Sequence, residues 1–96
     1  MGRIVMYMKW SGVTKDHYES IKKAINWEKE KPKGAVFHIA SFDKSGMRVT
    51  DVWESEKDFN DFAQKRIMPA VRKMGIRNEP EVEIHPAHST FAAAYE

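Results

Sequence analysis

The sequence predicts an α+β domain whose elements run strand, helix, strand, strand, helix, strand. Three observations predict this order: an apolar segment of strand length near the N-terminus, a sharp junction of strand and helix near residue 54, and Pro and Gly residues that separate the other segments. This order is typical of the ferredoxin-like arrangement, in which a four-stranded antiparallel sheet carries both helices on one face. We expect one such domain over residues 1–96, with a core at about 3–86 and a tail at 87–96.

The first strand and the first helix are predicted from the N-terminal third. Residues 4–10 read Ile-Val-Met-Tyr-Met-Lys-Trp, a mostly apolar run that favours a strand buried on both faces. Thr14 is suited to cap a helix that runs to about Trp27, because apolar residues recur there at helical spacing. Residues 28–34 form a charged run that ends in Pro and Gly, and they predict a loop.

A hairpin and a capped helix start are predicted next. Residues 35–42 and 47–54 favour strands, and Asp43-Lys44-Ser45-Gly46 supplies turn residues between them. Ser55, followed three positions later by Asp58, can satisfy free backbone amides in an arrangement like a capping box. The third strand should therefore stop at about residue 54, and the second helix should begin at residue 56.

The second helix and the last strand complete the order. Residues 56–74 carry a broad apolar stripe at helical spacing, which Pro69 interrupts. Because proline lacks an amide hydrogen, Pro69 should kink the helix or restart it from a first-turn position. Gly75 fits a left-handed C-cap, and residues 81–85 alternate as a half-exposed strand does.

Composition limits the classes of function. The 96 residues are 42% hydrophobic and carry a net charge of +2, which is too small an excess to predict nucleic-acid binding. There is no cysteine, which excludes disulfides and thiolate chemistry. The apolar run at 4–8 is too short for a signal peptide, and no segment reaches membrane-spanning length. We expect a soluble cytoplasmic protein that does not contact membranes.

A homodimer is the expected assembly. Two helices cover one face of the predicted sheet, yet the first strand is apolar on both sides. The simplest cover for the other face is the same sheet from a second copy in a two-fold dimer. The tail, which is apolar at Phe91 and Tyr95, could pack against that partner.

The junction Trp53-Glu54-Ser55-Glu56, together with Phe59, carries a resemblance to a known group. With the apolar first strand, Gly12-Val13-Thr14 before the first helix and Pro69 in the second, the chain resembles the antibiotic-biosynthesis-monooxygenase-like proteins. The resemblance spans most of residues 3–86 and implies a dimeric α+β barrel. In that group some members oxidise polyketide-like aromatics without a cofactor, others cleave haem, and others are isomerases or have no known activity.

The haem-cleaving members share a similar Trp-Glu-Ser-Glu stretch. They pair its Trp with an Asn on the first strand and a His on the second helix. Here only the Trp is present, as Trp53, since residues 4–10 contain no Asn and residues 56–74 no His. The resemblance therefore implies activity without a bound cofactor, and haem binding is a weaker alternative.

His38 and Asp51 are the candidate catalytic residues. His38 lies in the most apolar part of the second strand, and imidazole is the side chain best suited to proton transfer near neutral pH. Asp51 lies two residues before Trp53 and so on the same face of its strand. In a low-dielectric cleft its carboxylate could act as a base. The alternatives are a hydrogen-bonded structural histidine and an aspartate paired with Lys or Arg.

Trp53, Tyr7 and Phe62 are the candidate substrate-binding residues. Trp53 offers a flat face for stacking and one N–H to orient an aromatic ligand, or else it closes the rim of the core. Tyr7 could direct a phenol at a substrate carbonyl or pack in the dimer interface, and Phe62 lies on the apolar stripe of the second helix.

Two further histidines, His85 and His88, are three residues apart after the last strand. Such a pair can bind zinc only with a third ligand on a fixed scaffold, and Pro86 disfavours a helix there. We expect neither a metal nor a cofactor.

The leading hypothesis is a homodimeric enzyme that acts on a small hydrophobic molecule, an aromatic or polyketide-like substrate. It would be a cofactor-independent monooxygenase or isomerase. The alternative is a non-catalytic dimer that binds a hydrophobic ligand or serves as a structural or stress-related module.

Overall fold

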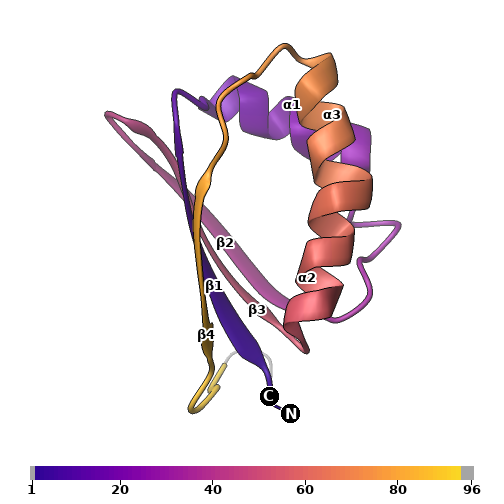
Figure 1. The fold of residues 1–96 in the computed structure, drawn as a ribbon, viewed down its shortest axis with the longest axis vertical. Helices are drawn as coiled ribbons and strands as arrows, with labels where there is room; N and C mark the ends of the chain where they lie inside the picture. Colours follow the sequence, from indigo (N-terminus) through magenta and orange to yellow (C-terminus); the bar gives the residue numbers. More distant parts are fainter. Residues whose placement is uncertain (1, 94–96) are drawn as a thin grey trace.

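A computed structural model describes residues 2–93 and confirms the predicted order of elements. The sheet has the strand order β2-β3-β1-β4, and each neighbouring pair is antiparallel. The helices lie together on one side of it (Figure 1), so the arrangement is ferredoxin-like. The elements are β1 (Ile4–Ser11), α1 (Lys15–Ile25), β2 (Ala35–Asp43), β3 (Gly46–Trp53), α2 (Glu56–Phe62), η1 (Ala63–Ile67), α3 (Met68–Lys73) and β4 (Glu81–Pro86).

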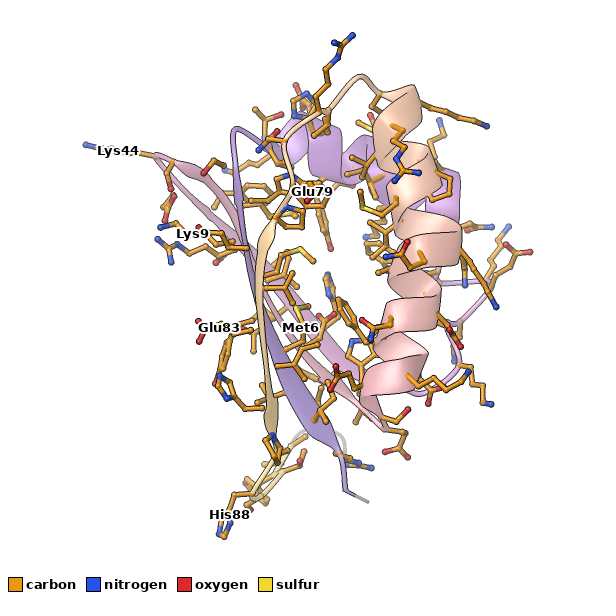
Figure 2. All side chains as sticks on the ribbon, viewed as in Figure 1. Met6, Lys9, Lys44, Glu79, Glu83 and His88 are labelled. Carbon is orange, nitrogen blue, oxygen red and sulfur yellow. The ribbon has the colours of Figure 1, made fainter. Side chains whose placement is uncertain are left out.

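Strand β1 alternates between the two faces of the sheet. Met6, Met8 and Trp10 are buried, whereas Tyr7 and Lys9 are exposed. Figure 2 shows Met6 directed between the sheet and the helices, and Lys9 directed away from them. The sequence predicted that this strand is buried on both faces. In a single chain only its inner face is buried, because the helices all cover the same side of the sheet.

The hairpin turn sets the register of β2 against β3. The Asp43 carboxylate accepts hydrogen bonds from the backbone amides of Ser45 and Gly46, at 2.9 and 3.2 Å. Gly46 has a φ of +146°, and a Cβ there would lie 2.3 Å from a carbonyl oxygen of β1, so only glycine fits. Counting residues back from this turn places His38 directly opposite Asp51.

The second helical segment stays helical through Pro69. It consists of α2, a short stretch of π-helix (η1) and α3, with Pro69 in the first turn of α3. Proline cannot donate to the carbonyl four residues earlier, and the wider π turn lies directly before it. Phe62 and Ile67, at the two ends of this π turn, face the sheet. No helix within residues 2–93 is long and apolar enough to cross a membrane.

The junction of β3 and α2 has the predicted Ser55 cap, while the reciprocal bond of a capping box is found among the described helices at α1. The Ser55 hydroxyl accepts the backbone amide of Asp58 at 3.1 Å, and Glu56 and Asp58 place negative charge on the first turn. The preceding loop approaches closely: a Cβ on Gly34 would lie 2.3 Å from the Asp58 carboxylate. The Gly34 carbonyl also accepts the amide of Glu54 at 2.8 Å. The Ser55 cap therefore fixes the helix start, and the contacts of Gly34 hold the end of the loop before β2 against it.

Substitution Ser55→Ala should lower the free energy of unfolding by about 1 kcal/mol, because an amide at the helix start loses its acceptor. Urea denaturation measures this change. Ser20→Ala, the same substitution inside α1 with no cap, is the matched control and should leave stability unchanged or slightly higher. Equal losses in both variants would contradict a capping role.

Candidate functional site

A largely apolar cavity of about 110 Å³ lies between the inner face of the sheet and the helices. Its floor includes Met6 and Val49 from the sheet, and Ile67 lines it from the helical side. Its chemistry comes from three polar side chains that touch one another, which belong to Tyr18, His38 and Asp51. An apolar space with a few convergent polar groups is the usual form of a small-molecule site.

Three hydrogen bonds join four side chains at this site. The Tyr18 hydroxyl lies 2.9 Å from His38 Nε2, and His38 Nδ1 lies 2.6 Å from Asp51 Oδ1. The indole of Trp53 donates to the other carboxylate oxygen, Asp51 Oδ2, at 3.0 Å. The result is one continuous chain from Tyr18 to Trp53.

These bonds determine where the His38 hydrogen lies. A carboxylate only accepts hydrogen bonds, so the imidazole Nδ1 carries the hydrogen that is donated to Asp51. In the neutral ring, Nε2 is then an acceptor, and the Tyr18 hydroxyl donates to it. A carboxylate that orients an imidazole whose far nitrogen binds a hydroxyl is the arrangement that serves proton transfer in many enzymes.

Three secondary-structure elements, α1, β2 and β3, bring these hydrogen-bonded side chains together. Asp51 and Trp53 both face inward because they are two residues apart on β3. The hairpin register places His38 opposite Asp51, and α1 presents Tyr18 one turn after its Thr14 cap. Each position depends on a local signal, but only the packed fold places them within hydrogen-bond distance.

Tyr18 is held by aromatic neighbours. Its ring is parallel to that of His38, with centroids 6.1 Å apart and an interplanar angle of 3°. Trp27 and Phe42 pack against it at 5.8 and 5.9 Å. Burial raises the pKa of the Tyr18 phenol above its ordinary value of 10.0, and the negative charges of Glu19, Asp51 and Glu28 add to the effect. The residue therefore stays a neutral phenol at neutral pH.

The cavity lining differs in its exposure. Trp27 and Pro32, from the loop between α1 and β2, line the cavity together with His38, whose side chain is 36% exposed. Trp53, in contrast, is 3% exposed and packs against Phe62 at 5.5 Å. The cavity thus has a partly exposed polar residue in His38 and a buried aromatic wall in Trp53 and Phe62.

The structure places four of the five predicted residues at this cavity and the fifth elsewhere. His38, Asp51, Trp53 and Phe62 all line it. Tyr7 lies on the outer face of the sheet, where it is 46% exposed and its ring centroid is 6.3 Å from that of His85. It instead borders a second, open groove on that face.

The hydrogen bonds of Asp51 and Trp53 limit the roles that were predicted for them. Asp51 is 6% exposed, and both of its carboxylate oxygens accept hydrogen bonds. It orients His38 rather than presenting a free carboxylate to the cavity. The Trp53 N–H is likewise engaged, so Trp53 offers a ligand its ring surface and not a free donor.

Sequence analysis missed Tyr18 and Trp27 as site residues. Tyr18 lies on the apolar stripe of α1, where it looks like an ordinary core aromatic, and Trp27 lies at the start of a charged loop. Only their contacts with His38 mark them as part of the site. No pattern in the sequence carries that information, because the contacts join α1 and its following loop to β2.

The two histidines near the end of β4 lie on or just after the edge strand. His85 lies 3.4 Å from a carboxylate oxygen of Glu83 on the outer face. Within residues 2–93 no group of three or more His, Asp or Glu side chains is placed to hold a metal ion.

Substitution Asp51→Asn should switch the tautomer of His38. The Trp53 N–H needs the Asn oxygen as its acceptor, so the Asn NH₂ faces Nδ1 and donates to it. The His38 hydrogen then moves to Nε2. Nitrogen NMR of the imidazole distinguishes the two tautomers, and a hydrogen that stays on Nδ1 would contradict the proposed hydrogen-bond chain. His38→Gln, whose spectrum lacks the imidazole signals of His38 alone among the four histidines, identifies those signals in the wild type.

Comparison with known proteins shows the fold. The sequence matches no protein-family model and no curated protein. The solved structures that it resembles include NE2512 from Nitrosomonas europaea, a protein of unknown function (TM-score 0.72, 14% identity, 96% of this chain and 95% of that one). They also include the cofactor-independent oxygenase SnoaB from Streptomyces nogalater (TM-score 0.66, 16% identity, 94% and 97%). A third is a candidate antibiotic biosynthesis monooxygenase from Caulobacter crescentus (TM-score 0.61, 17% identity, 92% of each chain). The chain therefore has the fold of the antibiotic-biosynthesis-monooxygenase-like proteins, as its sequence resemblance predicts.

Proposed function

We propose that this protein is a cofactor-independent enzyme that removes a proton from an aromatic or polyketide-like substrate and lets the resulting anion react. The observation that carries the proposal is the pairing of His38 with the buried Asp51 at an apolar cavity. A neutral imidazole held by a carboxylate can accept a proton near neutral pH. The fold shared with a cofactor-independent oxygenase supports the same reaction class.

The proton step uses His38 as the final acceptor. Loss of an acidic proton from the substrate leaves its electron pair delocalised over the ring. The proton ends on His38 Nε2, and the imidazolium is stabilised by Asp51 at the 2.6 Å hydrogen bond. The low dielectric of the cavity strengthens that ion pair.

The second step consumes dioxygen or rearranges the anion. In the oxygenase form, dioxygen adds to the electron-rich ring carbon, and the peroxide anion takes a proton back. Cleavage of the O–O bond and of the C–H bond at that carbon then releases water and leaves a carbonyl. In the isomerase form, the proton simply returns at a different carbon. Dioxygen is the one co-substrate that the first route requires.

The cavity volume limits what can be enclosed. An engineered cavity of roughly 150 Å³ in another protein holds a benzene molecule. The cavity here, at about 110 Å³, is smaller, so it would enclose at most a single ring against Trp53 and Phe62. Larger parts of a substrate would extend out of the cavity beside the partly exposed His38.

A homodimer is part of the proposal. The outer face of the sheet exposes large apolar side chains, among them Tyr7, Phe37 and Ile39, which are 46%, 42% and 54% exposed. Apolar surface of this kind usually marks an interface. A second copy of the sheet would cover it and close a barrel.

The enzyme hypothesis predicts binding and oxygen uptake with simple phenols. Hydroquinone and 1-naphthol should raise the melting temperature of the protein by mass action. Oxygen uptake above the protein-free rate should follow, and His38→Gln should reduce it by about 100-fold or more, because general-base catalysis contributes that much. An oxygen electrode measures the rates.

His17→Gln is the matched control, since His17 caps α1 outside the cavity and Gln is a usual residue at that position of a capping box. It should retain the full rate. Binding of the phenols without uptake or isomerisation would favour the alternative, a non-catalytic ligand-binding dimer.

The dimer is tested by light scattering, which should give twice the chain mass of 11.2 kDa at micromolar concentration. Ile39→Lys places a charge on the outer face and should shift the mass to that of a monomer. Val82→Lys is the control, because Val82 lies opposite Met8 on the edge strand β4 and thus toward the helix side. A wild-type monomer would refute this assembly.

A further inference from the structure

We propose that Tyr18, rather than His38, is the catalytic residue that contacts the substrate. Its phenol oxygen takes the substrate's hydroxyl proton while its own hydrogen passes to His38 Nε2. The substrate is accordingly a phenol or an enol whose hydroxyl is conjugated to the reacting carbon. This inference rests on the proposed function, and it specifies the order in which Tyr18 and His38 receive a proton.

The hydrogen bonds of His38 leave it no free nitrogen. Nδ1 is bonded to Asp51 at 2.6 Å, and Nε2 is bonded to the Tyr18 hydroxyl at 2.9 Å. A substrate that approaches the imidazole therefore meets Tyr18 first. The phenol oxygen donates one hydrogen to Nε2 and keeps its acceptor capacity, so it can bind a substrate hydroxyl.

Packing holds Tyr18 in this position. The ring is stacked parallel to His38 and is flanked by Trp27 and Phe42 at 5.8 and 5.9 Å. Rotating the phenol away from Nε2 would break these contacts together with the hydrogen bond. Tyr18 and His38 both line the cavity, so the oxygen lies where a bound ring can reach it.

The charges around Tyr18 favour a coupled transfer. Glu19 on α1, Glu28 on the following loop and Asp51 on β3 are negative, and with burial they raise the phenol pKa. A free tyrosinate is therefore disfavoured as an intermediate. The substrate O–H bond and the Tyr18 O–H bond break together, a new O–H bond forms on Tyr18, and a new N–H bond forms on His38. The electron pair stays on the substrate oxygen and is delocalised into its ring.

Tyr18 then stabilises the product of this step. Once the proton has moved, the phenol of Tyr18 is intact and can donate to the substrate oxyanion. A hydrogen bond to a charged oxygen is stronger than one to a neutral partner. The site should thus bind a phenolate more tightly than an uncharged ring of the same shape.

The probe for this inference is 4-nitrophenol, a single ring whose ionised form absorbs visible light. Wild-type protein should bind it ionised and lower its apparent pKa. Tyr18→Phe keeps the ring but removes the oxygen, and it should weaken binding of the phenolate by about tenfold or more. His38→Gln should bind the dye in its neutral form, because the proton has lost its acceptor.

The matched ligand control is 4-nitroanisole, which has the same ring without an acidic proton. Tyr18→Phe should bind it as the wild type does, and an equal loss for both ligands would reduce Tyr18 to a packing role and overturn the inference. If ionisation of the dye requires His38 but is unchanged in Tyr18→Phe, the imidazole contacts substrate directly, and the inference fails while the proposed function stands. If the wild type binds no dye, or if His38→Gln ionises it as the wild type does, both fail.

Discussion

The burial of the Asp51 carboxylate is the constraint on which the rest of the site depends. A buried charge is tolerated only when hydrogen bonds replace its water, and here each oxygen has one protein donor, from His38 and Trp53. Those two bonds fix the tautomer of His38 and the orientation of the indole. They also leave Nε2 as an acceptor, which positions the Tyr18 hydroxyl. The hairpin turn, the packing of α1 and the aromatic wall thus each position a side chain of the hydrogen-bonded series that includes Asp51.

The sheet divides the molecule into two chemically different sides. The inner side is closed by α1 and by the helical run from α2 to α3, and it holds the cavity and the polar chain (Figure 1). The outer side exposes Tyr7, Phe37 and Ile39, and it carries an open groove lined in part by the segment after β4. Of the predicted tail at 87–96, residues 87–93 line this groove, while residues 94–96 fall outside the described part of the chain. The proposed chemistry and the proposed dimer would therefore use opposite sides of the sheet.

Part of the site could be predicted because side chains alternate between the two faces along a strand, which is a local property. Asp51 and Trp53 had to share a face, and the turn at 43–46 had to pair β2 with β3. The sequence could not assign Tyr7 to a side of the sheet, since the first strand is apolar on both. Nor could it give Tyr18 a role, because a tyrosine on an apolar helical stripe satisfies the core and the cavity equally well.

The sequence by itself determined the order of elements, the caps at Thr14 and Ser55 and the position of the hairpin, because these depend on residues within a few positions of one another. It also identified His38 and Asp51 as polar residues in apolar strands. Only the tertiary structure decided that they touch, that Asp51 has no free oxygen and that Tyr18 completes the chain. The reason is physical: a hydrogen bond requires two groups within about 3 Å, and for residues on three different elements that distance is set by packing of the whole sheet against its helices.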